Sequence, residues 1–277
     1  MGVNRTDWTV LKLGGELLED DVRMSGLSRA IAWASRTTTL AVVHGGGREV
    51  DAALARAGLQ KRQVDGLRIT DEATLGIVIE VLAGAVNTRF VAAINAAGAL
   101  AVGLTGADGR LVTVIPAAPH VGVDGRVTDL GLVGNPVSEA AVDLLRHLAS
   151  GGYVPVIASI GIGDNGALYN VNADTLAAHL AGSLAARRLV IAGATAGVLD
   201  ATGRTIPALD RDARGRLIES GVASAGMIAK LRACEDALTR GAREVLLVDG
   251  RNPDTVATVL AGGRDGTADS KTTRMVA

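Results

Sequence analysis

The sequence is poor in aromatic residues, cysteine and net charge, and each shortage excludes a class of function. Two tryptophans, two tyrosines and one phenylalanine in 277 residues leave little to stack on bases, and 28 basic against 29 acidic residues give no attraction for nucleic acid. A lone cysteine, Cys234, cannot form an internal disulfide, which is typical of a reducing cytosol. The polar stretch 1–8 lacks the apolar core of a signal peptide, and we expect no membrane-spanning run because Gly, Arg or Asp interrupts each apolar one. We therefore expect a soluble, cytoplasmic protein without nucleic-acid or membrane partners.

Motifs of several large enzyme classes are also missing. The sequence has no G-x-x-x-x-G-K-[ST] phosphate loop and no C-x-x-C or H-E-x-x-H metal spacing. Residues 161–166, GIGDNG, match the dinucleotide pattern G-x-G-x-x-G. However, residues 167–171 alternate like a strand instead of starting a helix, and no acidic residue lies between Thr175 and Val198. We interpret 161–166 as containing a hairpin turn and reject a dehydrogenase.

What the sequence does contain is a repeated strand–glycine–helix theme. Residues 40–43, LAVV, read as a buried strand; His44 and three glycines follow, and 48–55 have the composition of a helix start. Bare glycines before a helix leave N–H groups at the positive end of its dipole, where an anion binds. Residues 9–13 followed by Gly14 and Gly15 repeat the theme. If both strands are parallel in one sheet, the two turns lie at the same edge.

Lysine is scarce, since only Lys12, Lys61, Lys230 and Lys271 occur among the 28 basic residues. A chain that prefers arginine is expected to keep lysine where a compact ammonium is needed, and we regard Lys61 and Lys271, in polar surroundings, as incidental. Lys12 interrupts an apolar strand, which is costly unless it meets an anion or the strand lies at a sheet edge with the ammonium in water. Lys230 lies within the first turn of a helix predicted to start at 226, where a cation opposes the dipole unless an anion is shared.

Two further polar groups follow predicted strands. Arg68 adjoins a glycine just before a long predicted helix over 71–97, where it is either a carboxylate-binding fork or a solvated arginine. In 170–174, NVNAD, the asparagines and the aspartate are either helix caps or a functional cluster. Glycine turns, isolated lysines, an arginine and this cluster suit phosphoryl transfer, which needs positioning and charge neutralisation more than a covalent nucleophile.

Five motifs, in this order, make the chain resemble the amino acid kinase family over nearly its whole length: KLGG at 12–15, VHGGG at 43–47, GLRIT at 66–70, NVNAD at 170–174 and GMIAK at 226–230. The resemblance implies a three-layer αβα sandwich with a mainly parallel central sheet. It also implies transfer of the ATP γ-phosphoryl group to the side-chain carboxylate of N-acetyl-L-glutamate, giving an acyl phosphate for arginine biosynthesis.

The resemblance also assigns roles to residues. Lys12 and Lys230 would stabilise the transition state and Asp174 would orient both lysines. The acylamino acid and the transferring phosphoryl group would be held by Gly46, Gly47, Arg68 and Asn170. ATP would bind at Gly14, Gly15, Gly193, Ala194, Gly197, Val198, Gly226 and Met227, and Mg²⁺ would be held mainly by the phosphates, with no protein metal site. Residues 1–185 would form the substrate-binding and dimerisation lobe, and 186–277 the nucleotide lobe.

Some features depart from the family pattern or leave alternatives open. Ala194 stands where the family usually has Asp, and Ala225 where it often has Asp or Gly, which is expected to weaken ATP binding. The alternatives are a kinase for carrier-linked aminoadipate in lysine biosynthesis, disfavoured by the third glycine of 45–47, and a sensor without turnover, for which Ala194 is the only sequence support. Because the chain starts close to Lys12, we expect a homodimer with little arginine feedback rather than a hexamer.

Overall fold

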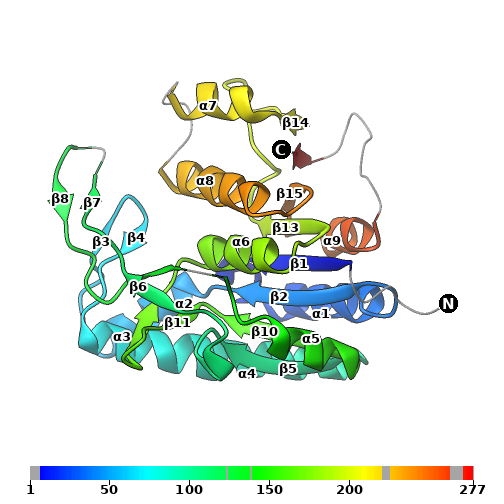
Figure 1. Ribbon diagram of the computed structural model, residues 1–277, viewed down its shortest axis with the longest axis horizontal. Coiled ribbons are helices and arrows are strands. Elements are labelled where there is room, and N and C mark those ends of the chain that lie inside the picture. The colour runs from blue at the N-terminus through cyan, green and yellow to red at the C-terminus, as the bar shows by residue number, and fades with distance from the viewer. Residues whose placement is uncertain (1–6, 123, 138, 220–224, 263–270, 277) are drawn as a thin grey trace.

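The centre of the computed structural model, which describes residues 7–122, 124–137, 139–219, 225–262 and 271–276, is an eight-stranded sheet. In Figure 1 it runs from β14 at the top to β5 at the bottom, in the order β14-β16-β15-β13-β1-β2-β10-β5. Strands β15 and β16 pair antiparallel, and the other neighbours are parallel. The strand bounds are β1 Trp8–Leu13, β2 Thr39–His44, β5 Leu100–Thr105, β10 Tyr153–Ala158, β13 Arg188–Gly193, β14 Ala208–Leu209, β15 Val245–Asp249 and β16 Thr272–Met275.

Helices cover both faces of this sheet, which confirms the expected αβα sandwich (Figure 1). One face packs against α1 (Asp21–Ala34), α2 (Gly47–Arg56), α4 (Asn87–Ala96) and α9 (Pro253–Leu260). The other face packs against α5 (Asp143–Ser150), α6 (Ala173–Ser183) and α8 (Ala225–Thr239), and α7 (Arg211–Glu219) lies beside β14. Buried Cys234 belongs to the α8 side of the core.

Strand β1 carries Lys12 through the middle of the sheet. All six residues of β1 are buried, and Lys12 pairs in register with Val43 of β2 and Ile191 of β13. The alternative of an edge-strand lysine is therefore excluded. Val10, two residues before Lys12, packs in the α6 side of the core, so the pleat directs Lys12 to that side as well.

The long helix predicted over 71–97 is present, but its middle is not an ordinary α-helix. Asp71 caps it by accepting from the Thr74 N–H, and α3 (Glu72–Ile79) runs through a π-helical segment, Glu80–Val86, into α4. The helix Glu72–Ala96 is long and apolar enough to span a membrane, judged by length and composition alone. The expectation that no apolar run approaches the length of a membrane span was therefore too strong. The inner face of this helix, including Leu82, Phe90 and Ile94, packs in the core.

The described residues also form four separate antiparallel pairs of short strands. They are β3–β4 (Gln63–Val64, Leu67–Arg68), β6–β9 (Val114–Pro116, Gly134–Pro136), β7–β8 (His120–Val121, Val127–Thr128) and β11–β12 (Ile160–Ile162, Leu168–Asn170). The β11–β12 pair confirms the hairpin interpretation of 161–166. In Figure 1, β3–β4 and β7–β8 stand at the left, the side to which the arrowhead of β2 points.

Candidate active site

The glycine turns after β1 and β2 meet at the carboxyl edge of the sheet, as the sequence predicted. Gly45 N–H donates to the carbonyl of Leu13 (3.3 Å), and a Cβ on Gly15 would lie 2.4 Å from the Gly46 Cα. Only glycine at position 15 permits this approach. Beside the turns is a cavity of about 250 Å³ that eight of the predicted site residues line: Lys12, Gly14, Gly15, Gly46, Gly47, Arg68, Asn170 and Asp174.

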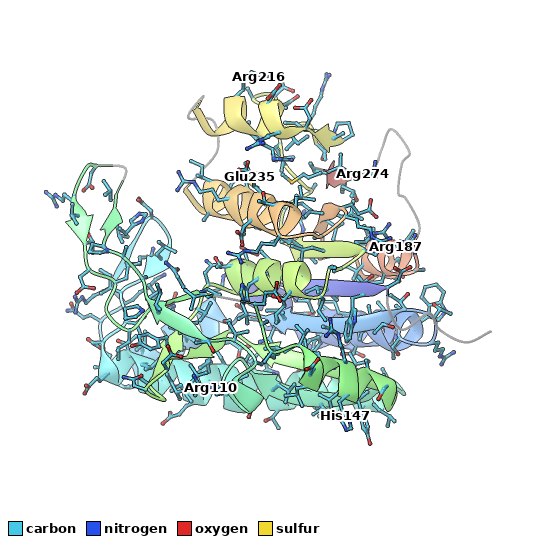
Figure 2. The ribbon with its side chains drawn as sticks, in the orientation of Figure 1. Arg110, His147, Arg187, Arg216, Glu235 and Arg274 are labelled. Atoms are coloured by element: carbon cyan, nitrogen blue, oxygen red, sulfur yellow. The ribbon has the colours of Figure 1, made fainter. Side chains whose placement is uncertain are left out.

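A buried ion pair forms the floor of this cavity. Lys12 Nζ lies 2.8 Å from Asp174 Oδ1, and their side chains are 9% and 14% exposed. Burial alone would raise the pKa of Asp174, but the charges of Lys12 and Lys230 outweigh it and hold the pKa below its ordinary value of 3.8. In contrast, polar residues such as Arg110, His147 and Arg216 lie exposed on the outside of the ribbon (Figure 2). Two cations from different elements thus share one buried carboxylate.

Lys230, on α8, acts on this carboxylate through its charge. The helix is described from Ala225 onward, so Lys230 lies in its second turn and not, as predicted from the sequence, in the first turn. Its Nζ lies 3.3 Å from the point that a Cβ on Gly193 would occupy, at the carboxyl end of β13. Gly193 therefore leaves room for an ammonium between the β1 and β13 turns.

Arg68, on β4, faces the cavity with part of its guanidinium unpaired. One terminal nitrogen, Nη2, donates to the Gly47 carbonyl (3.1 Å) and to the carboxylate of Asp51. The other, Nη1, is buried and has no hydrogen-bond partner among the described residues. A buried guanidinium nitrogen without an acceptor is costly, so an oxygen ligand from the cavity is favoured there. Asp51 also pairs with Lys61 (2.8 Å), so Lys61 supports this arrangement instead of being incidental.

All three polar residues of the 170–174 cluster line the cavity, and Asn172 is also the cap of α6. The Asn172 side chain accepts hydrogen bonds from the N–H groups of Asp174 and Thr175 and so caps α6. This capping role accounts for an asparagine at this position. Asn170 ends β12, and its amide donates to the hydroxyl of Thr70 (3.2 Å), which leaves its carbonyl oxygen and second amide hydrogen available to a ligand.

A buried histidine holds the glycine turn after β2. Burial lowers the pKa of His44 to about 4, so the ring is neutral near pH 7. His44 Nδ1 lies 3.0 Å from the Gly45 carbonyl, and the Asn87 amide donates to Nε2 (2.9 Å) and to the Val156 carbonyl (3.0 Å). Only the tautomer with hydrogen on Nδ1 satisfies both contacts. Leu82 of the π-helical segment lies against Gly46, where a Cβ would come within 2.7 Å of it.

The residues predicted for ATP do not all gather at the cavity. Ala194 is exposed beside Gly193, at the end of β13. Gly197 and Val198 instead pack against β16: a Cβ on Gly197 would lie 2.5 Å from Thr273 Oγ1, which accepts from the Val198 N–H. Gly226 and Met227 belong to the first turn of α8 as described. Neither pair lines the cavity beside Lys12.

Sequence reasoning missed two acidic residues at the site, Glu16 and Asp51. Glu16 lines the cavity and accepts from the Ala194 N–H, and Asp51 anchors Arg68. Neither belongs to a motif, although both follow a glycine turn within five residues. Within the described ranges, no group of three or more His, Cys, Asp or Glu side chains is arranged to hold a metal.

Comparison with known proteins gives consistent results. Residues 7–249 match the model of the amino acid kinase family. An acetylglutamate kinase from Gluconacetobacter diazotrophicus is 40% identical over 251 residues, which cover 89% of this chain and 80% of that protein. One from Solibacter usitatus is 39% identical over 259 residues, covering 93% and 97%. The structure of N-acetylglutamate synthase from Neisseria gonorrhoeae, complexed with coenzyme A and N-acetyl-glutamate, matches with a TM-score of 0.82 at 25% identity; the match covers 99% of this chain and 60% of that one.

We expect Asp174→Asn to destabilise the protein at pH 7 by about 3 kcal/mol, because Lys12 stays buried without its counter-charge. The folded-state pKa of Asp174 is below 3.8, so its contribution is present above the unfolded pKa and is lost as the pH falls through the folded value. In denaturant unfolding, the difference in the free energy of unfolding between wild type and Asp174→Asn should become smaller below pH 3.8.

The matched control is Asp143→Asn, which removes a carboxylate that is 94% exposed and should leave the free energy of unfolding nearly unchanged. Equal stability of wild type and Asp174→Asn at pH 7, or a gap that persists undiminished to the lowest pH at which both proteins fold, contradicts the prediction.

Proposed function

Because this chain belongs to the amino acid kinase family, we propose that it is an acetylglutamate kinase. It transfers the γ-phosphoryl group of ATP to the side-chain carboxylate of N-acetyl-L-glutamate, forming N-acetyl-L-glutamyl 5-phosphate in arginine biosynthesis. The observation that carries the proposal is the pair of ammonium groups, Lys12 and Lys230, that share the buried Asp174 carboxylate beside two glycine turns.

Phosphoryl transfer between two oxygens places negative charge on both the attacking and the leaving group. Lys12 and Lys230 neutralise that charge, and Asp174 holds Lys12 in place through their ion pair and attracts the ammonium of Lys230. The N–H groups of Gly15, Gly46 and Gly47 hold the phosphoryl oxygens in flight. These residues contribute to catalysis by neutralising charge and by positioning. Loss of one of these donor groups is expected to lower kcat by about 10²- to 10³-fold.

The acceptor occupies the cavity on the β2–β4 side. Arg68 has a buried, unpaired Nη1 that suits an oxygen of the amino acid's α-carboxylate, and the Asn170 amide suits the N-acetyl group. Two negative groups on one small molecule match a site with a guanidinium at one end and an ammonium at the other.

ATP binds on the β13–α8 side, in the lobe formed by 186–277, and the acylamino acid binds in the lobe formed by 1–185. The adenosine-side residues Gly193, Ala194, Gly197, Val198, Gly226 and Met227 belong to this half of the chain, with Gly14 and Gly15 at the phosphates. Mg²⁺, held mainly by the ATP phosphates, supplies charge neutralisation when bound.

We place the enzyme in the cytoplasm.

The function is tested by trapping the acyl phosphate with hydroxylamine in the presence of ATP, Mg²⁺ and N-acetyl-L-glutamate. Wild type should form hydroxamate. Arg68→Lys should raise the KM for N-acetyl-L-glutamate about tenfold, because lysine cannot reproduce the guanidinium fork, with the KM for ATP unchanged.

Arg62→Lys is the control, since the Arg62 side chain is 59% exposed and its Nη1 lies 3.7 Å from Asp71 Oδ2 in a long surface ion pair. If no hydroxamate forms while N-acetyl-L-glutamate still raises the melting temperature, the protein is a sensor and the kinase proposal is wrong. Hydroxamate formed only with carrier-bound aminoadipate assigns the lysine-biosynthesis reaction instead.

We also propose a homodimer built on the Glu72–Ala96 helix. Its outer face presents small or apolar exposed residues to solvent, namely Ala73, Gly76, Gly84, Ala85 and Ala92. It lies beside β5, the last strand of the sheet, where Leu100 is 57% exposed. Small side chains on an exposed helix face allow the close approach of a second subunit, and exposed apolar residues beside them favour its burial.

Light scattering should give the mass of two subunits for wild type and of one subunit for Gly84→Arg. A Cβ at Gly84 has no neighbour within 4 Å in its own subunit, so the arginine obstructs the interface and not the fold. Ala55→Arg, on the exposed side of α2, should remain dimeric. A wild-type mass of one or six subunits contradicts the proposal.

A further inference from the structure

Glu16 has a position that the catalytic account does not use. It follows the glycines at the end of β1, inside the short 3₁₀ turn Gly15–Leu17. Its Oε1 accepts a hydrogen bond from the Ala194 N–H (3.2 Å), which links the β1 turn to the β13 turn. The carboxylate lies directly over Gly14, where a Cβ would come within 2.3 Å of Oε1.

The surroundings of this carboxylate are those of an anion site. The point that a Cβ on Gly193 would occupy lies 3.8 Å from Glu16 Oε1 and 3.3 Å from Lys230 Nζ. Within the described part of the chain, no lysine or arginine lies within ion-pair distance of Glu16. The Glu16 carboxylate therefore occupies a backbone N–H donor and a glycine-lined space that suit a phosphate oxygen. No ion pair among the described residues compensates its charge there.

We propose that Glu16 is an internal competitor of the nucleotide phosphates: its carboxylate must turn away from Gly14 and Ala194 before ATP can bind. This inference rests on the proposed binding of ATP at this edge of the sheet. Two negative groups cannot share the space without strong repulsion. Glu16 is then a determinant of nucleotide affinity, and its charge, rather than its size, is what opposes ATP.

The local structure permits such a movement. Arg23 Nη1 donates to the Glu16 carbonyl (3.2 Å) and so holds the backbone, while within the described ranges a single hydrogen bond, to the Ala194 N–H, holds the side chain. The side chain is half-buried at the cavity, and rotation about its χ angles removes the carboxylate without disturbing the buried residues Gly15 and Leu17.

The test compares wild type with Glu16→Gln, which keeps the shape and removes the charge, and Glu16→Ala as a second variant. Titration calorimetry without an acceptor measures the affinities for ATP in EDTA, Mg-ATP, pyrophosphate and adenosine. Both variants should bind ATP and pyrophosphate about fivefold or more tightly than wild type, with adenosine unchanged. Glu19→Gln is the control, because Glu19 is an exposed residue nearby whose carboxylate, among the described residues, pairs only with Arg48, at 3.5 Å; it should behave as wild type.

Equal or weaker binding of metal-free ATP by Glu16→Gln overturns the proposal. Weaker binding that appears only with Mg²⁺ identifies Glu16 as a metal ligand and overturns it too, as does the absence of ATP and pyrophosphate binding to all variants. Tighter ATP binding in a protein that forms no hydroxamate would contradict the kinase function and leave the role of Glu16 standing.

Discussion

The ion pair between Lys12 and Asp174 is the constraint on which the rest of the site depends. An ammonium on the central strand of a parallel sheet is tolerated only when a counter-charge reaches it, and Asp174 does so from the first turn of α6. The position of α6 against β1, and of α8 against α6, therefore fixes where both lysines stand. A helix shifted along the sheet would leave Lys12 buried and unpaired.

The backbone around this pair is built for close approach. The β1 and β2 turns come so near that Gly15 has no room for a side chain, and His44 fixes the β2 turn through a neutral ring bonded to Asn87. The π-helical segment brings Leu82 against Gly46 from behind, and such segments commonly occur at functional sites. The edge of the sheet is thus closely packed at the site proposed for the phosphoryl oxygens.

Much of this arrangement was predictable from the sequence because it depends on local patterns. The apolar strands, the glycines that follow them and the asparagine cap of α6 have short-range signatures, and parallel strands place their turns at one edge. Lys12 was identifiable as unusual because it interrupts a buried strand. The repeated strand–glycine–helix theme predicts an α/β protein with parallel strands, and the resemblance to the amino acid kinase family implies the three-layer αβα sandwich.

Contacts between distant segments left no such signature. The pairing of Arg68 with Asp51, and the consequent role of Lys61, depends on how the β3–β4 hairpin folds over α2. Glu16 reaches Ala194 across 178 positions in the chain. The π-helical segment replaces α-helix where the sequence shows only a continuous apolar periodicity. Each of these is set by tertiary packing, which overrides local propensity.

The central claim is that Lys230 acts with Lys12 on the same phosphoryl group. It is tested most directly by kcat of Lys230→Gln at saturating ATP and N-acetyl-L-glutamate. The account predicts a kcat lower by about 10²-fold or more, with the KM for N-acetyl-L-glutamate within about threefold of wild type. An unchanged kcat, or a loss confined to that KM, would show that Lys230 does not act on the transferring group.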